Sequence, residues 1–290
     1  MVRLFVDGKR HSGAYPSDCR LFVLDAFTER PFAGNPAAVC VSDEIVDEAL
    51  MQLLAGELNL SETAFLRPLP GGGRYALRWF TPTSEVDLCG HATLASGAVV
   101  LTHLQPKLDK VTFETRSGPL GVARSKSGYV MDFPELPVAP LAAAPKILDG
   151  LERALGKRPA GLYKSVNLLA EYLSAADVRA LHYRGALEEV LDEAGFWGLI
   201  ATARGDPGTS QDFVSRFFAP KKGIPEDPVT GSAHCALAPF WGARLGRSFL
   251  TGYQASARGG LVRCELKGGG RVGLEGHCVE ILTARLSLSQ

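Results

Sequence analysis

Three side chains in this sequence carry groups that could move a proton in catalysis. Glu62 lies in the stretch NLSETAF, His91 directly follows Gly90, and Asp227 directly precedes a proline. Carboxyl and imidazole groups exchange protons well when their surroundings bring the pKa near the working pH, and partial burial is one way to do so. The apolar residues around Glu62 favour such burial. We therefore treat Glu62, His91 and Asp227 as candidate catalytic residues.

Each of these residues also has a structural interpretation. Most glutamates are exposed, and Ser61-Glu62-Thr63 could start a short turn or helix. A single histidine is usually a structural one, and an aspartate before a proline is common in turns. Taken residue by residue, the catalytic and structural interpretations both stay open.

Two glycines could build a binding site for a negatively charged group. The stretches 90–92 and 231–233 both read Gly-x-Ala, and each opens an apolar segment of small residues with helical composition. A glycine at a helix start allows close approach to the backbone, and the unpaired N–H groups there attract anions. We predict that a substrate carboxylate is bound by Gly90, Gly231 and Ser232, with Ser61, next to Glu62, as an additional donor.

The two Gly-x-Ala stretches belong to an internal repeat. Segments 74–100 and 212–241 each contain a strand-like run that ends in aromatic-x-Pro, then an acidic loop, then Gly-x-Ala. One isolated copy would favour simple helix packing. Two copies in matching contexts favour a functional role and predict two related halves with a cleft between them.

The elements that must position these residues are short strands and a few helices. Gly 32 and Pro 18 together favour many turns. Runs with alternating, β-branched or aromatic residues predict strands at 21–27, 37–41, 74–80, 110–116, 129–133, 196–203, 212–218, 261–266 and 279–286.

Four stretches in order along the chain resemble the phenazine biosynthesis-like (PhzF-like) isomerase family, which has the diaminopimelate epimerase type of fold. They lie at 23–40, 58–66, 87–95 and 223–234. The resemblance implies an α+β fold of two pseudo-symmetric domains, each a curved β-sheet or barrel wrapped around a central helix. We expect a lead-in at 1–19, domains at 20–133 and 134–278, and a final strand at 279–290 that returns to the first domain.

The resemblance also implies a function. It points to a cofactor-independent isomerase that shifts a proton on a small carboxylate-bearing substrate, cyclic substrates included. By this resemblance, Glu62 is the general acid/base, and His91 and Asp227 are the other catalytic residues. A homodimer is implied by the same similarity.

Two rival hypotheses remain. Two-base racemases of this fold place a thiol before each glycine helix start, so Cys89 suggests an amino- or hydroxy-acid epimerase or racemase. The matching position before Gly231 is Thr230, however, which cannot act as a base without help. The other rival is a non-catalytic binding protein on the same fold. Asn35, in a Gly-Asn-Pro turn, is a weaker candidate for the pocket.

Composition excludes several functional classes. The chain has 290 residues, with 31 Lys+Arg and 31 Asp+Glu, and 46% of its residues are hydrophobic. This balance does not favour nucleic acid or membrane surfaces as partners, and we expect a cytoplasmic protein. The six cysteines are scattered, and the spacing of His and Cys indicates no metal site. No cofactor is expected.

Overall fold

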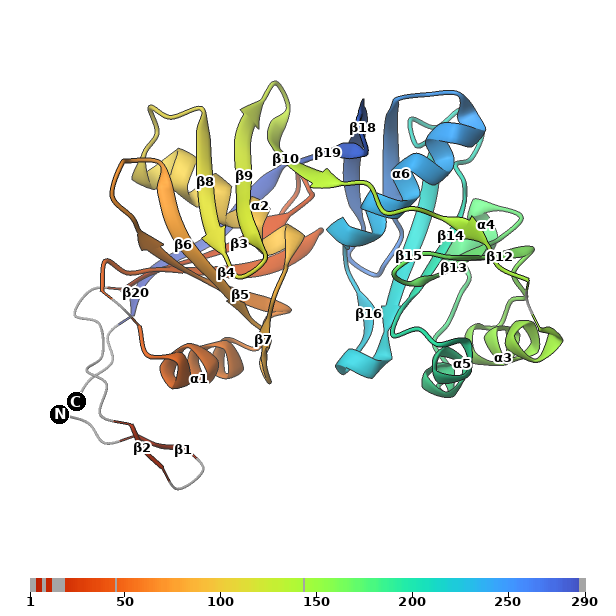
Figure 1. Cartoon of the computed structure of the whole chain (residues 1–290), viewed down its shortest axis with the longest axis horizontal. Coiled ribbons are helices and arrows are strands. Elements are labelled where there is room, and N and C mark those ends of the chain that lie inside the picture. The colour runs from red at the N-terminus through yellow and green to blue at the C-terminus, as the bar shows by residue number, and fades with distance from the viewer. Residues whose placement is uncertain (1–3, 7–8, 12–18, 45, 143, 287–290) are drawn as a thin grey trace. The chain divides into compact units, whose positions relative to one another are not determined.

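The chain forms two compact units. The computed structural model describes residues 4–6, 9–11, 19–44, 46–142 and 144–286 (Figure 1). Unit 1 comprises 1–32, 36–131 and 277–290, and unit 2 comprises 33–35 and 132–276. The predicted domain boundaries after residues 133 and 278 stay predictions. Most of the predicted lead-in at 1–19 lies outside the described residues; two short strands within it pair as an antiparallel hairpin.

The described residues of unit 1 form eleven strands, although Asn35 of β4 and the last residues of β10 cluster with unit 2. The strands are β1 (Leu4–Val6), β2 (Lys9–His11), β3 (Cys19–Ala26), β4 (Asn35–Val41), β5 (Glu62–Pro68), β6 (Arg74–Phe80), β7 (Glu85–Val86), β8 (Lys110–Thr115), β9 (Gly118–Ser125), β10 (Gly128–Pro134) and β20 (Cys278–Leu286). Its helices are α1 (Glu48–Leu58) and α2 (Gly90–Val99), the latter continued by the π-helical turn η1 (Val100–Leu104).

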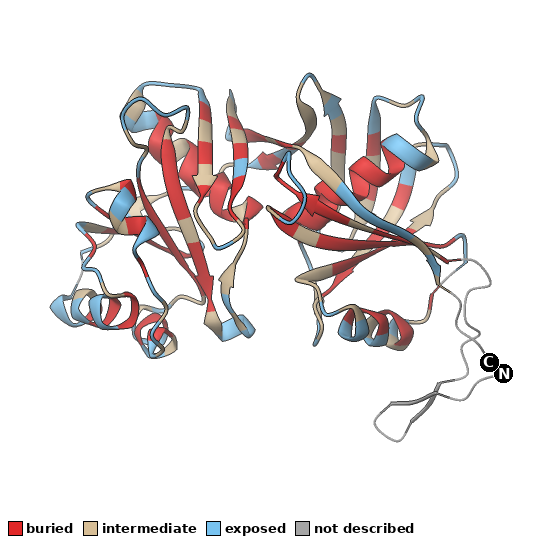
Figure 2. Ribbon diagram, turned by 180° about the vertical axis from the view of Figure 1, so that it is seen from behind, coloured by how far each residue is buried: buried red, intermediate tan, exposed pale blue. Residues whose placement is uncertain are grey.

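The sheet of unit 1 alternates parallel and antiparallel pairs around helix α2. β4 pairs with β5 in parallel, β5 with β6 antiparallel, and β6 with β8 in parallel. β8, β9 and β10 continue as antiparallel neighbours, and β20 returns to pair with β3. Every residue of α2 from His91 to Val99 is buried (Figure 2). This helix is therefore the core of the unit.

In unit 2, the part of the chain that the structure describes forms nine strands and four helices. The strands are β11 (Ala139–Pro140), β12 (Gly161–Lys164), β13 (Leu168–Glu171), β14 (Leu199–Arg204), β15 (Phe213–Ala219), β16 (Ile224–Asp227), β17 (Phe249–Gln254), β18 (Gly260–Gly268) and β19 (Arg271–Gly276). The helices are α3 (Pro145–Leu155), α4 (Ala175–Arg179), α5 (Leu187–Ala194) and α6 (Gly231–Leu245), with a 3₁₀ turn η2 (Pro220–Lys222) before β16.

The pairing order of unit 2 repeats that of unit 1. β13 pairs with β14 in parallel, β14 with β15 antiparallel, and β15 with β17 in parallel. β17, β18 and β19 then continue antiparallel. Most residues of α6 are buried, so this helix takes the place that α2 has in unit 1.

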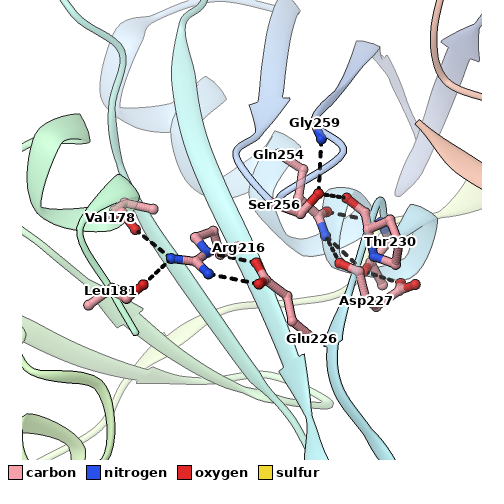
Figure 3. A network of polar contacts seen from close by, with 10 residues as sticks. Val178, Leu181, Arg216, Glu226, Asp227, Thr230, Gln254, Ser256 and Gly259 are labelled. Atoms are coloured by element: carbon pink, nitrogen blue, oxygen red, sulfur yellow. Dashed lines mark hydrogen bonds and ion pairs between the residues drawn. The ribbon is translucent and has the colours of Figure 1, made fainter. Parts of the chain in front are cut away.

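The two units also share an ion pair at equivalent positions, so the repeat extends to side chains. Arg78 on β6 forms a two-pronged pair with Glu85, with both N···O distances 2.7 Å. Arg216 on β15 forms the same two-pronged ion pair with Glu226, with N···O distances of 2.6 and 2.7 Å (Figure 3). Each guanidinium group also lies about 5 Å over the ring of a phenylalanine two residues further along its strand. The predicted α+β fold with two pseudo-symmetric halves, each built around a helix, is confirmed.

The described residues contain no helix that is both long enough and apolar enough to cross a membrane.

Candidate active site

Glu62 is the first residue of strand β5. The strand begins there because Thr63, Ala64 and the residues after them are buried in the sheet, and Glu62 itself lies beside Ala37 of β4 in parallel register. Its side chain is 14% exposed. The alternative that Ser61-Glu62-Thr63 starts a helix is wrong, since the chain enters a strand at this point.

Helix α2 brings a thiol and an imidazole to the same carboxylate. Cys89 is the N-cap residue of α2 with extended backbone, and His91 is the second residue of the helix. His91 Nε2 lies 3.2 Å from Glu62 Oε2, and His91 Nδ1 lies 3.5 Å from Cys89 Sγ. The structure thus brings Glu62 and His91 together, as the prediction requires, and adds Cys89 to them.

His91 is a neutral imidazole at physiological pH. Burial lowers its pKa to about 3, because a charged ring would lose its hydration. A hydrogen bond to the backbone carbonyl of Pro36 acts weakly in the opposite direction. The contact with Glu62 is therefore a polar contact between a neutral ring and a carboxyl group, although its distance would also suit an ion pair.

Asp227 ends strand β16 in unit 2 and accepts two hydrogen bonds. Asn35 Nδ2 donates to Oδ1 at 2.8 Å, and the Thr230 hydroxyl donates to Oδ2. Burial raises the pKa of Asp227 to about 6, while the hydroxyl of Thr230 and the amide of Asn35 oppose that rise. This carboxyl group therefore changes its protonation state close to neutral pH.

Side chains bind each backbone carbonyl of the turn from Asp227 into helix α6, and Figure 3 shows Gln254 and Ser256 among them. The backbone carbonyls of residues 227, 228, 229 and 230 accept hydrogen bonds of 2.8–2.9 Å from, in that order, Gln254, Ser256, Asn35 and His234. Gln254 also accepts the N–H of Thr230 at 2.9 Å. We call these four side chains the turn clamp.

The turn clamp sets the start of α6. Thr230 uses its hydroxyl for Asp227 and does not cap the helix with it. The N–H groups of the first helical turn have no acceptor within a helix, so those of Gly231 and Ser232 are the donors available to a ligand. Ser61, Gly90 and Ser232 keep part of their surface exposed, whereas Gly231 is buried.

Three members of the turn clamp carry no clear signal in the sequence that marks them as functional. Gln254, Ser256 and His234 lie outside any acid/base pattern, and only Asn35 was noted as a candidate. The signal that could have found them is weak: Gln254 ends a strand-like run, and polar residues there are usually exposed. In the structure, Gln254 and His234 are completely buried.

The candidate groups are not duplicated between the two units. Aligned on Gly90 and Gly231, His91 matches Ser232, and Val86 matches Asp227. The strand registers Thr63↔Phe80 and Leu199↔Phe218 likewise match Glu62 with Gly198. The two units therefore share the arrangement of strands and helices but carry different candidate residues at equivalent positions.

Within the part of the chain that the structure describes, one group of side chains could hold a metal ion. The donor atoms of Glu62, Cys89 and His91 lie within 4.8 Å of one another. Sequence spacing did not reveal this group, because Glu62 on β5 and the Cys89–His91 pair at the start of α2 are brought together only by the fold of unit 1.

The comparisons with known proteins agree with this architecture. The family model described as phenazine biosynthesis-like protein matches residues 24–284. The chain is 43% identical over 267 residues to an uncharacterized isomerase of Pseudomonas aeruginosa, covering 92% of this chain and 97% of that one.

Solved structures show the same fold. A PhzF-family phenazine biosynthesis protein of Enterococcus faecalis matches with a TM-score of 0.85 and 39% identity, covering 93% of this chain and all of that one. A probable proline racemase of Agrobacterium radiobacter matches with a TM-score of 0.59 at 11% identity, which shows a shared fold alone. On the family model and these relatives, the chain belongs to the phenazine biosynthesis-like (PhzF-like) family.

Proposed function

We propose that this protein is a cofactor-independent isomerase that shifts a proton on a small carboxylate-bearing substrate, with Glu62 as the general acid/base. Family membership and a relative named as an isomerase support the reaction class. One observation carries the assignment to Glu62: its largely buried carboxyl group lies 3.2 Å from a neutral imidazole at the start of a buried helix.

The chemical step uses one carboxyl group twice. The Glu62 carboxylate removes a proton from a carbon near the substrate carboxylate or ring, and the electron pair of the C–H bond moves into the adjacent π-system. The protonated Glu62 then returns the proton to a different carbon of the same molecule. A base that works in both directions must be neither strongly acidic nor strongly basic, which suits a partly buried carboxyl group.

The helix starts are the donors that hold negative charge during this step. The N–H groups at the start of α2 belong to the same turn as His91, whose ring contacts Glu62. The positive end of the helix dipole favours a carboxylate or enolate there. Gly231 and Ser232 keep their predicted role as carboxylate donors, and Asp227 its role in fixing the substrate. The predicted position of the site between the two halves stays a prediction.

A two-thiol racemase is the less favoured function. Such an enzyme needs a second thiol at the position of Thr230, whose hydroxyl instead donates a hydrogen bond to Asp227. Cys89 remains close to His91 at 3.5 Å, so a racemase that uses this single thiol with another base is the form of that hypothesis to test.

The experiment is a survey of proton exchange. The protein is incubated in deuterium oxide with a panel of small cyclic and acyclic carboxylates, and proton NMR follows deuterium incorporation and any new isomer. We expect incorporation together with migration of a double bond. Inversion of a stereocentre that is lost in Cys89→Ser would instead favour the racemase, and binding of a panel member without exchange would favour a non-catalytic binding protein.

A homodimer and a cytoplasmic location remain predictions from the resemblance and the composition.

A further inference from the structure

In unit 1, the side chains of Glu62, Cys89 and His91 lie close together and offer three kinds of donor atom: a carboxylate oxygen, a sulfur and an imidazole nitrogen. The group comes from the start of β5 and the first turn of α2, two elements that are fixed by the buried core of the unit. Their donor atoms lie within 4.8 Å of one another. Neither the proposed proton transfer nor the turn clamp uses the thiol.

The donor atoms lie near the spacing of a four-coordinate metal site, with the two short contacts made to different nitrogens of His91. Zinc–ligand bonds of about 2.0–2.3 Å at tetrahedral angles place neighbouring donor atoms about 3.3–3.6 Å apart. The contacts here are 3.2 Å between Glu62 Oε2 and His91 Nε2, and 3.5 Å between Cys89 Sγ and His91 Nδ1. One metal ion uses a single ring nitrogen, so the side chains must rotate to bring donor atoms that now lie within 4.8 Å of one another to the spacing of a bound metal.

The surroundings of His91 favour its use as a ligand. A ligating histidine commonly donates its other N–H to a backbone carbonyl, which fixes the tautomer and the ring orientation. The hydrogen bond from His91 to the Pro36 carbonyl supplies that partner. Cys89 is the N-cap residue of α2, so its sulfur lies at the start of the same helix that carries His91.

We propose that Glu62, Cys89 and His91 form a binding site for one thiophilic divalent cation of the Zn²⁺ class, and that occupancy of this site inhibits the enzyme. Thiolate and imidazole donors select Zn²⁺, Co²⁺ or Cd²⁺ over Mg²⁺ and Ca²⁺. Two anionic ligands and a neutral ring balance the charge of the cation. The inhibitory part rests on the proposed role of Glu62, because a carboxylate bound to metal cannot accept a proton; the binding part does not.

A comparison with unit 2 predicts how many metal ions each chain binds. Thr230 and Ser232 stand where unit 1 has Cys89 and His91, and Gly198 stands where it has Glu62. Those residues offer no comparable set of ligands. One metal ion per chain is therefore expected.

The test uses Co²⁺ chloride and the full-length, reduced and chelator-treated protein. Wild-type protein should bind one Co²⁺ per chain and show a thiolate-to-cobalt charge-transfer band, and Zn²⁺ but not Mg²⁺ should remove the band. Cys89→Ser should abolish the band, while Cys278→Ser, which removes a half-buried thiol elsewhere in unit 1, should keep it. Glu62→Gln should weaken Co²⁺ binding at least about tenfold.

The outcomes separate this proposal from the proposed function. A band that survives in Cys89→Ser, or no band in wild-type protein, overturns the metal site; circular dichroism of each variant checks its fold. Binding that leaves deuterium incorporation unchanged at saturating Zn²⁺ overturns the inhibition. A protein that binds Co²⁺ as described but exchanges no substrate proton supports the site and contradicts the proposed function.

Discussion

At the scale of single residues, the two units divide the chemistry between them. Glu62 and His91 have no counterparts in unit 2, where Gly198 and Ser232 occupy the matching positions. Asp227 has no counterpart in unit 1, where the matching residue is Val86. Gly198 cannot easily regain a side chain, since a Cβ there would lie 2.9 Å from Asn167 and Phe217. The roles of the two units are therefore not interchangeable.

The raised pKa of Asp227 makes stability depend on pH. Burial holds the folded pKa at about 6, above the ordinary value of 3.8, so the folded state binds a proton more tightly than the unfolded state between these values. The free energy of unfolding should therefore fall as the pH rises from about 4 to about 6, by at most about 1.4 kcal/mol per pH unit.

Asp227→Asn should remove this contribution, and Asp109→Asn, which changes an exposed aspartate, should not. Thermal unfolding of the three proteins between pH 4 and pH 7 measures the effect. Identical pH profiles for wild-type protein and Asp227→Asn would show that the carboxyl group does not titrate in this range.

The candidate site residues could be identified from motifs that resemble the family's, and their chemistry alone would not have singled them out. Glu62, His91 and Asp227 were singled out because each stands in a recognisable stretch, and the structure places Glu62 beside His91. Gln254 could not be found in this way, because nothing in a strand-end glutamine indicates that both ends of its amide are bound inside the protein. Its role depends on a contact 24 residues away in sequence.

At the scale of elements, the two central helices need close contact with their sheets. A Cβ on Gly97 of α2 would lie 2.4 Å from a methyl group of Val122 on β9. Gly97→Ala should therefore destabilise the protein by about 1–3 kcal/mol through overpacking, even though alanine favours helix formation.

Gly56→Ala on α1 is the matched control. Its Cβ would meet only the Pro82 carbonyl, at 3.4 Å, so the gain in helix propensity should dominate and stabilise the protein by up to about 1 kcal/mol. Urea unfolding of both variants measures the difference. Equal effects of the two substitutions would contradict the tight packing of α2.

The turn clamp gives a second prediction for an element. Gln254→Met keeps the size of the side chain but leaves the Thr230 N–H and the Asp227 carbonyl without their buried partner. The loss should be roughly 1–3 kcal/mol for each group. Gln211→Met, at a partly buried glutamine in the same unit, should change stability little, and equal losses in both variants would argue against the clamp.

Part of the secondary structure was predictable, because alternation and Gly-x-Ala starts are local signals. The nine predicted strand runs all coincide with strands, and residues 90 and 231 do begin α2 and α6. Short strands such as β7, β11 and β16 were not predicted, since strands of two to four residues carry too little alternation to be recognised. Longer strands were missed as well, among them β5, which begins at Glu62, and β9, β17 and β19.

At the scale of the whole molecule, the chain returns to its first unit at the end. β20 pairs antiparallel with β3 from Cys278 opposite Ala26 to Leu286 opposite Cys19. Ala284 and Leu286 also pack against the core cluster that contains Leu50 and Phe65. Unit 1 is therefore incomplete without residues that follow unit 2.

A chain that stops at Gly276 should lose the fold of unit 1, because β3 would become an uncovered edge and part of the core would be exposed. Separate expression of 277–290 in the same cells should restore soluble protein. Amide hydrogen exchange in β3, β5 and α2 measures the loss, and unchanged protection in the shortened chain would contradict the dependence on β20.

Deuterium incorporation by a Glu62 variant tests the central claim most directly. With a substrate found in the panel, Glu62→Gln should fold as wild type does but lose incorporation by at least about a hundredfold, as expected for removal of a general acid/base. Glu57→Gln, at an exposed glutamate on α1, should exchange at the wild-type rate. Wild-type incorporation by Glu62→Gln would contradict the account.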